Sequence, residues 1–394
     1  MFDYLIVGGG IIGLSVADAL QTRRPGARIA VIEKESELGT HQSGHNSGVI
    51  HSGIYYTPGS RKAELTREGR ADLVAFCREQ GIPLRIPGKL IAASGPEDIE
   101  RLRALQGRGV ANGVDCRWLS GEQAMEIEPH LRCDAALFVP AAGVVEFREV
   151  CRKLGERLTM RGGTIRTGSP VRSIDSRSSS LVVITGSAEI EARQLINCAG
   201  LHSDRVARMA GVEPPVRIVP FRGEYWSIRE ERSFLVKELV YPVPDPRFPF
   251  LGIHLTRGID QRVHAGPNAV VAWKREGYDK RSFLLRDTVE TLLFRGFWKM
   301  AGRHAGRGLA ELLRSSSRQL FARSLRRLIP ELTEDDLESF SSGVRAQAVA
   351  RDGTLVDDFL VVENERTFHL LNVPSPAATA SPAIARWVAA HFES

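Results

Sequence analysis

The chain has 394 residues, of which 43% are hydrophobic and 25% are charged, a composition typical of a soluble globular protein with one large or two ordinary domains. Neither a signal peptide nor a membrane span is expected, because a strand pattern starts at Asp3 and the longest uncharged run, residues 367–385, contains three prolines. The five cysteines are scattered and form no C-x-x-C pair, which argues against an iron–sulfur relay and favours a reduced, cytoplasmic compartment. Any electron carrier is therefore expected to come from outside the chain.

The N-terminal residues predict a dinucleotide-binding unit. Residues 3–7 form an apolar strand, Gly-Gly-Gly-Ile-Ile-Gly occupies 8–13, a helical pattern covers 14–20, and a second strand, 28–32, ends on Glu33. A glycine pattern alone is weak evidence, but this order of strand, glycine turn, helix, strand and acid is the context that the fingerprint requires.

Each part of the fingerprint has a physical task. Gly8 permits the tight turn, Gly10 lets the backbone approach a pyrophosphate, and Gly13 lets the helix pack on the strand. The pyrophosphate is expected at the helix N-terminus, where free N–H groups and the helix dipole favour negative charge. Glu33 is expected to accept a hydrogen bond from the adenosine ribose, which disfavours a 2′-phosphate.

Extended segments in the rest of the chain outnumber what a simple NAD dehydrogenase needs. In chain order, the predicted elements are a His-, Gly- and Ser-rich loop (39–59), a helix (61–80), a strand (89–93), a helical stretch (96–129), an extended segment (138–145), a helix (148–161), short strands (164–166, 171–174, 181–185 and 189–191), a buried strand ending in a glycine turn (194–200), an antiparallel sheet (216–271), a basic helical stretch (291–327), strands (359–362 and 369–372) and a helix from Ser375.

The net charge of +6 is concentrated in the basic segment, residues 291–327. This segment has nine basic residues and one acidic residue, so it carries +8 and the rest of the chain −2. Basic residues at every fourth position share one helical face, namely Arg295, Lys299, Arg303 and Arg307. With Phe294, Phe297 and Trp298 opposite, the pattern is typical of a helix lying in a membrane interface, and equally of a solvated helix packed on its own domain.

Several motifs carry a resemblance to a known family: GHNSGVIH at 44–51, NCAGLHSD at 197–204, FRGEYW at 221–226, SGVRAQ at 342–347 and NVPSPAAT at 372–379. In these motifs, and over nearly its whole length, the chain resembles FAD-dependent oxidoreductases of the D-amino-acid oxidase and glycine oxidase superfamily. Within the superfamily it is most similar to the branch of the L-2-hydroxyglutarate dehydrogenases. The basic segment is not carried over from the superfamily core.

The resemblance implies an α/β fold with an α+β second domain. A Rossmann-like FAD-binding domain is expected to consist of residues 1–85, 146–212 and 336–394. A substrate domain with an antiparallel sheet is expected to consist of residues 86–145 and 213–335, including the basic segment.

FAD is the expected cofactor. The small Ala199 and Gly200 at a strand end offer a second backbone contact, and the turn at Ser375 starts a helix whose N–H groups suit the flavin pyrimidine ring, where reduction places negative charge. Whether His45 is linked covalently to the flavin stays open. The residues expected to bind FAD are Gly8, Gly10, Ile12, Gly13, Glu33, Lys34, Gly44, His45, Asn46, Ser47, Gly48, Val171, Ala199, Gly200, Ser375, Ala377, Ala378 and Thr379.

Oxidation of a 2-hydroxy acid requires a clamp for the α-carboxylate, a base for the hydroxyl proton and a path for the α-hydrogen to flavin N5. Arg345 matches the superfamily arginine that holds the substrate carboxylate, a task suited to a planar guanidinium, with a surface ion pair as the alternative. His254 lies on an apolar strand that lines the superfamily pocket and is the first candidate base, unless it is only a buried core residue; His51 is the second candidate. Candidates for binding a distal carboxylate are Tyr55, Tyr56, Arg222, Tyr241 and Arg257.

His41, His45 and His51 crowd one loop, but no nearby thiol or carboxylate completes a metal shell, so no metal is expected. The resemblance implies oxidation of L-2-hydroxyglutarate to 2-oxoglutarate, with electrons passed to a quinone or another external acceptor. The protein is expected in the cytoplasm or peripherally on the inner face of the cell membrane, without a nucleic-acid partner. Two alternatives stay open: an FAD-dependent oxidase of glycine, sarcosine or a D-amino acid, and a flavin-binding protein without turnover.

Overall fold

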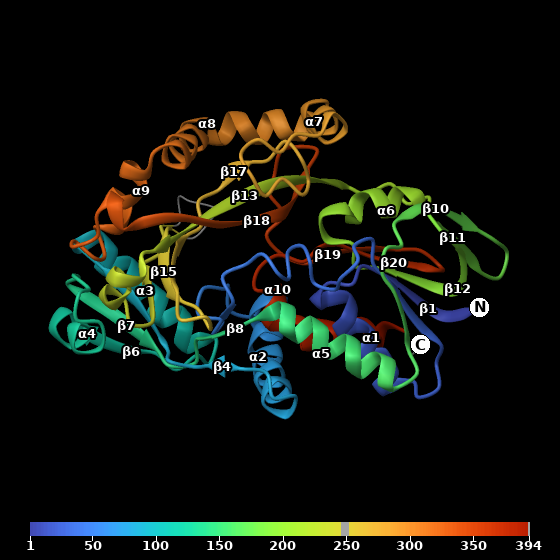
Figure 1. The fold of residues 1–394 in the computed structure, drawn as a ribbon, viewed down its shortest axis with the longest axis horizontal. Helices are drawn as coiled ribbons and strands as arrows, with labels where there is room; N and C mark the ends of the chain where they lie inside the picture. Colours follow the sequence, from blue (N-terminus) through green and yellow to red (C-terminus); the bar gives the residue numbers. More distant parts are fainter. Residues whose placement is uncertain (246–251, 393–394) are drawn as a thin grey trace.

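The structure is a computed structural model that describes residues 1–245 and 252–392. Within these residues the core contains an eight-stranded and a nine-stranded sheet, and the chain passes between them several times (Figure 1). No helix in the described ranges has the length and apolar character needed to span a bilayer.

The eight-stranded sheet holds the dinucleotide fingerprint. Its order is β10-β11-β12-β1-β2-β9, with β20 beside β12 and β19 beside β20. β1 pairs in parallel with both β2 and β12, as expected for a continuous apolar run buried on both faces. The strands are β1 (Phe2–Val7), β2 (Ile29–Ile32), β9 (Thr164–Arg166), β10 (Val171–Ser176), β11 (Leu181–Thr185), β12 (Glu189–Asn197), β19 (Leu360–Glu363) and β20 (Thr367–Asn372).

Alternate side chains of β1 enter two different cores, because successive residues of a strand point to opposite faces. Tyr4 and Ile6 pack against helices on one face, whereas Leu5 and Val7 pack with the β10–β12 meander and α6 on the other. The helices of the first face are α1 (Ile11–Arg23), α2 (Arg61–Glu79), α5 (Phe147–Met160) and α10 (Ala377–His391), and α6 is Ser203–Met209.

The nine-stranded sheet is mostly antiparallel, with the order β17-β13-β16-β15-β14-β5-β7-β6 and β18 paired to β13. Only the β14–β5 pair among its described pairings is parallel. Its strands are β5 (Lys89–Ala93), β6 (Arg117–Ser120), β7 (Ala135–Val139), β13 (Val216–Ile228), β14 (Leu239–Pro242), β15 (His254–Arg257), β16 (Val263–Gly266), β17 (Val270–Val271) and β18 (Leu337–Ala350).

The remaining elements flank the second sheet or join it to the first. Helices α7, α8 and α9 run along the outer side of β13 and β18 (Figure 1). A small sheet of β3, β8 and β4 links segments of the two large sheets. The bounds are β3 (Val49–Ile50), β4 (Leu84–Arg85), β8 (Gly143–Val145), α3 (Pro96–Ala111), α4 (Gly121–Ile127), α7 (Leu285–Leu292), α8 (Arg295–Ser316) and α9 (Arg318–Leu325).

Several predicted boundaries are wrong. Residues 96–129 are not one helical stretch, because strand β6 separates α3 from α4. The extended segment 138–145 is two strands: β7 ends at Val139, and Pro140, which has no N–H to donate, follows it. The strands expected at 189–191 and 194–200 are parts of one strand, β12.

The longest missed element is β18, which pairs with β13 over most of its length. The sequence analysis assigned residues 336–394 to the FAD-binding domain, but the hydrogen bonds of β18 place residues 337–350 in the nine-stranded sheet. Phe250 and Leu251, expected on the strand of His254, lie outside the described residues.

Candidate active site

A cavity of about 800 Å³ lies between the two large sheets. Its walls include the turn after β1, the end of β2, the loop at 39–56, the end of β12, the start of α10 and parts of β13, β14, β15 and β18. This volume is near the upper end of the range for ligand pockets. Both sheets therefore contribute to one site.

The glycine turn brings backbone, without side chains, to one end of this cavity. Gly8 has a φ of +114°, and a Cβ there would lie 2.5 Å from the carbonyl oxygen of Cys198. A Cβ on Gly13 would lie 2.0 Å from the oxygen of Gly8, so this residue fastens α1 to β1 as predicted. Gly10 and Ile12 line the cavity, whereas Gly13 does not, and its role is packing.

The N-terminus of α1 is arranged to receive an anion. The helix has no acidic residue in its first turn, and the N–H of Ile11 donates to Ser43 Oγ at 2.9 Å. Glu33 also lines the cavity, with its carboxylate accepting from the N–H groups of Gly9 (2.7 Å) and Glu35 (2.9 Å). Each carboxylate oxygen has a second lone pair, so Glu33 can still accept from a ribose hydroxyl.

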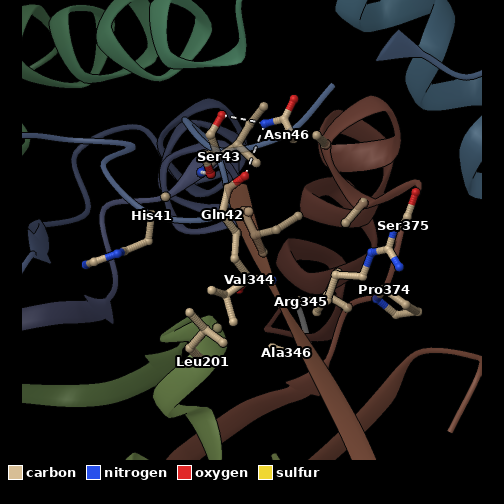
Figure 2. A pocket seen from close by; sticks show the side chains of 18 of the residues that line it. His41, Gln42, Ser43, Asn46, Leu201, Val344, Arg345, Ala346, Pro374 and Ser375 are labelled. Carbon is tan, nitrogen blue, oxygen red and sulfur yellow. Dashed lines mark hydrogen bonds between the residues drawn. The ribbon is translucent and has the colours of Figure 1, made fainter. Parts of the chain in front are cut away.

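The histidine-rich loop is pressed against β18 and a tyrosine. His45 Nδ1 lies 2.9 Å from the carbonyl oxygen of Ser342, and a Cβ on Gly343 would lie 2.2 Å from the oxygen of His45. The ring of His45 stacks on Tyr278 at 4.1 Å, and burial lowers its pKa. His45, Asn46 and Ser47 line the cavity. Figure 2 shows Asn46 beside Ser43.

Gly44 and Gly48 were predicted to bind cofactor but do not line the cavity. A Cβ on Gly44 would lie 2.6 Å from the oxygen of Gly39, and Gly48 has a φ of +67° with the oxygen of Val145 only 2.9 Å from a Cβ position. Both glycines therefore shape the loop, and their contact with the cofactor stays a prediction.

The opposite wall combines the end of β12 with the start of α10. Thr379 Oγ1 accepts a hydrogen bond from the backbone N–H of His51 at 3.0 Å and so ties α10 to the histidine loop. The same cavity is lined by the other predicted cofactor residues, namely Lys34, Val171, Ala199, Gly200, Ser375, Ala377, Ala378 and Thr379. A helix N-terminus here suits a ligand that gains negative charge.

Arg345 lies in the middle of β18 and reaches the cavity. Figure 2 shows its side chain beside Pro374 and Ser375 at the start of α10. Burial lowers its pKa, although a guanidinium still carries its charge at neutral pH. A planar cation in a cavity wall is a fitting receptor for a carboxylate.

His254 is held against Tyr241 and lines the same cavity. The two rings stack at 3.9 Å with 18° between their planes, and Nδ1 lies 3.0 Å from the carbonyl oxygen of Gly252. A carbonyl can only accept, so the proton is on Nδ1 and Nε2 is left with its lone pair. Burial lowers the pKa of His254 to about 3, with smaller contributions from the positive charges of Lys89 and Arg345.

His51, the second candidate base, also lines the cavity. Its Nδ1 atom is buried and has no hydrogen-bond partner among the described residues. Burial lowers its pKa to about 3, and the nearby charges of Lys89 and Lys62 act in the same direction. Both histidines are therefore neutral at pH 7, the form in which an imidazole accepts a proton.

Two predicted substrate ligands are not in the cavity. Arg257 points to backbone carbonyl oxygens, including those of Val236 and Ser233 at 2.7 Å, and holds a loop together. Arg222 is buried, pairs with Glu224 at 3.0 Å and donates to the oxygen of Asp279. The predicted Tyr56 and Tyr241, and also Tyr55, do line the cavity.

Lys89, which was not among the predicted site residues, lies directly behind the cavity wall. It is 1% exposed, and its Nζ donates to Tyr55 Oη at 3.1 Å and lies 4.4–4.7 Å from the ring centroids of Tyr55 and Tyr241. Burial lowers its pKa to about 7. A lysine opening the apolar strand Lys-Leu-Ile-Ala-Ala was the available signal, since lysine is rarely fully buried.

Lys62 was also missed. It lines the cavity, lies over the ring of Tyr56 and pairs with Asp357 at 3.0 Å. Its position in the first turn of α2 gave no signal beyond an ordinary helical lysine.

The reason given against a metal site was wrong in one respect. The structure brings the carboxylates of Glu35 and Glu276 to His41, with ligand atoms all within 4.8 Å of one another. The ammonium of Lys34 already lies among them, 2.7 Å from Glu276 and 2.6 Å from His41 Nε2. The cluster thus already contains a cation, the ammonium of Lys34, beside the cavity.

Comparison with known proteins assigns the family. The family model described as FAD dependent oxidoreductase (DAO) matches residues 3–391, so the chain belongs to this family and FAD is its cofactor. Solved structures with the same fold include L-alpha-glycerophosphate oxidase from Mycoplasma pneumoniae with FAD bound (TM-score 0.81, 20% identity, 100% of this chain and 95% of that one). Glycine oxidase from Geobacillus kaustophilus is another (TM-score 0.73, 22% identity, the same coverage). The predicted fold class and cofactor are confirmed.

More similar relatives are described as L-2-hydroxyglutarate dehydrogenases. The protein of Indibacter alkaliphilus is 44% identical over 385 residues, which cover 97% of this chain and 96% of that protein. The Escherichia coli K12 protein is 45% identical over 382 residues, covering 97% and 90%. The human mitochondrial protein is 42% identical over 406 residues, covering 98% and 88%.

Proposed function

We propose that this member of the FAD dependent oxidoreductase family oxidises L-2-hydroxyglutarate to 2-oxoglutarate. The observation that carries the proposal is the identity, over nearly the full length, to proteins described as L-2-hydroxyglutarate dehydrogenases. The cavity supports the proposal, because the guanidinium of Arg345 and the neutral imidazoles of His254 and His51 line the same cavity as the expected cofactor residues.

The reaction removes two electrons and two protons from the substrate. When bound, FAD would supply the two-electron acceptor for the α-hydrogen, and the cavity residues named above would hold it. The protein has to hold the α-carboxylate, accept the hydroxyl proton and exclude water. In our proposal Arg345 holds the α-carboxylate through two parallel N–H donors, and this fixes the α-carbon relative to the flavin.

We propose that Nε2 of His254 accepts the hydroxyl proton of the substrate. The other ring nitrogen, Nδ1, stays protonated because it donates to the Gly252 carbonyl. A pKa near 3 in the ligand-free cavity makes a weak base, but a bound dicarboxylate brings two negative charges, which raise the pKa of a nearby imidazole. His51 is the reserve candidate, since its buried Nδ1 lacks a partner among the described residues.

The distal carboxylate needs a second set of donors. Of the predicted candidates, Tyr56 and Tyr241 remain, together with Tyr55. The ammonium of Lys62 lines the cavity beside Tyr56, and Lys89 lies behind Tyr55 and Tyr241. We propose that this group of hydroxyls and ammonium charges favours substrates with a second carboxylate.

The direct test is anaerobic reduction of the holoenzyme flavin. Both enantiomers of 2-hydroxyglutarate, lactate, malate, sarcosine and glycine are added separately, and bleaching of the flavin absorbance is followed. L-2-hydroxyglutarate should bleach the flavin fastest. Faster bleaching by glycine or sarcosine would indicate an amine oxidase, and no bleaching by any of them would leave a flavin-binding protein without turnover.

We propose that the electrons leave to a quinone while the protein is docked peripherally on an anionic membrane. The basic segment provides attraction of roughly 1 kcal/mol per basic residue close to such a surface. Arg295, Lys299 and Arg303 are exposed as this requires, and the side chain of Arg307 lies outside what the structure describes.

Of the three aromatic residues expected to contact the membrane, Phe294, Phe297 and Trp298, only Trp298 is exposed. Phe294 and Phe297 are 9% and 6% exposed and pack with Val219 and Val349 in the core, so they cannot insert into lipid. Trp298 is 58% exposed and remains a candidate. Other exposed apolar side chains of α7, α8 and the turn between them are candidates in place of the phenylalanines, namely Leu285, Val289, Leu293, Leu309, Leu312 and Leu313.

A further inference from the structure

A second cavity, of about 570 Å³, lies where the start of α8 meets the turn after β18 and the segment between α6 and β13. It shares no lining residue with the flavin cavity. Two acidic residues, Glu213 and Asp352, face an excess of basic ones. The basic residues that line it are Arg208, Arg217, Arg295, Lys299 and Arg351.

Close backbone packing fixes the geometry of this second cavity. A Cβ on Gly296 would lie 2.3 Å from the carbonyl oxygen of Ala350, and a Cβ on Gly353 would lie 2.7 Å from the backbone nitrogen of Met300. The first turn of α8 is therefore locked against the turn after β18, which bears Arg351. The cations come from separate parts of the chain but are held in fixed relative positions.

Carboxylates offset only part of this positive charge: Asp204 lies 3.7 Å from Arg208, and the pKa of Asp352 is lowered by hydrogen bonds from Thr354 and also by the charge of Lys299. Glu213 is shared by Arg208 and Arg351, each at 3.6 Å. Asp352 accepts hydrogen bonds from its own turn, from the N–H and hydroxyl of Thr354. Within the described ranges of the chain, neither Arg295 nor Lys299 forms an ion pair.

Within the part of the chain that the structure describes, Arg217 is the member of the basic cluster with an unsatisfied hydrogen-bond donor. Its guanidinium lies over the ring of Phe294 at 5.1 Å and donates to the backbone oxygen of Glu290 at 2.8 Å. Its Nε is buried and has no acceptor among the described residues. Burial lowers the pKa of Arg217 and the positive charge of Arg208 lowers it further, while the carboxylates of Asp204 and Glu290 act in the opposite direction.

We propose that this second cavity binds an anion of the phosphate class. A phosphate group offers several acceptor oxygens and up to two negative charges, which match a cluster of guanidinium donors and an ammonium. The start of α8 adds to the attraction, because the helix has no acidic residue in its first turn and no side-chain cap to offset its positive end. Two sources carry this group: a phospholipid headgroup at the proposed membrane surface, or a soluble phosphate ester.

The first experiment titrates FAD-loaded protein with inorganic phosphate and pyrophosphate by calorimetry, at constant ionic strength set with chloride. One saturable site is expected. The double variant Arg295→Gln with Lys299→Gln should weaken binding about tenfold or more, because two charged donors are lost. Both side chains are exposed, so the fold should survive, and Arg217→Gln, at a half-buried position, is the second test.

The matched control is Arg323→Gln with Arg327→Gln, which removes the same charge from exposed positions outside the cavity. It should leave anion affinity within about twofold, since screened surface charges contribute little. Absence of saturable binding, or equal weakening by both double variants, would overturn the proposal.

A second experiment distinguishes the two sources. Vesicles of phosphatidylcholine with phosphatidylglycerol are compared with vesicles of phosphatidylcholine alone. If the cavity variant loses vesicle binding far more than the charge-matched control, the ligand is a lipid headgroup. If both lose it equally while only the cavity variant loses pyrophosphate, the ligand is a soluble phosphate ester. The test is independent of turnover, so it stands apart from the proposed oxidation.

Discussion

Arg345→Lys keeps a positive charge at the proposed carboxylate clamp but removes the planar pair of N–H donors. The side chain reaches the cavity from the middle of a long paired strand, so the backbone should not respond to the change. Loss of one hydrogen bond to a charged group costs about 1.5–3 kcal/mol. Since about 1.4 kcal/mol corresponds to a factor of ten, kcat/KM for L-2-hydroxyglutarate should fall about 10- to 150-fold.

The assay is anaerobic stopped-flow reduction of the flavin over a range of L-2-hydroxyglutarate concentrations, with FAD content measured from absorbance. Arg262→Lys is a suitable control, because its side chain is 67% exposed and lies outside the cavity. The FAD content of both variants should match that of the unaltered protein. Reduction of Arg345→Lys within about twofold of the unaltered rate at low substrate would refute the clamp, since even one such bond is worth more.

His254→Ala should slow anaerobic flavin reduction by a factor of ~100 or more with FAD retained; if His51→Ala has the larger effect, the role of base moves to that residue. The pH dependence of stability has a defined sign: the unfolded chain binds protons on histidine near pH 6.5, whereas folded His51 and His254 stay neutral down to a pKa of about 3. The free energy of unfolding measured in urea should therefore fall as pH drops from 6.5 toward 3. The double variant His51→Asn with His254→Asn should show a smaller fall over this pH range. If its free energy of unfolding depends on pH as strongly as that of the unaltered protein, the two histidines are not neutral and buried as assigned. Sedimentation with anionic vesicles should be lost at high salt and reduced by Trp298→Ser but not by Phe234→Ser, a similarly exposed aromatic remote in sequence from the basic segment; equal binding to neutral vesicles would count against electrostatic docking.

Local sequence patterns predicted the fingerprint because its physics is local. Gly8 needs a positive φ, and Gly13 needs close approach to β1, and both requirements are met within a few residues of chain. The fold class followed from the family resemblance, and the cofactor from the fingerprint together with the motifs near Ala199 and Ser375 and that resemblance. The residues proposed to act on substrate stay predictions, although the structure places Arg345, His254 and the cofactor wall in one cavity.

Long-range pairing explains most of what the sequence analysis missed. β18 contains Ser, Gly, Arg and Gln, and it reads as a strand only when β13 is beside it. Arg222 and Arg257 looked like carboxylate ligands because charge is visible in a sequence. Their actual partners, Glu224 and a set of backbone carbonyls, are decided by tertiary packing. The burial of Lys89 likewise depends on tyrosines from two distant segments.

Both ends of the chain build the cofactor cradle: α10 packs against α1 and α2, and β20 lies beside β12 (Figure 1). During synthesis, the Ser375 turn is made long after the glycine turn. Domains generally fold as units once their sequence is available. A chain that ends before residue 375 lacks one wall of the site, so truncation of α10 should abolish cofactor retention even though Arg345 and His254 are still present.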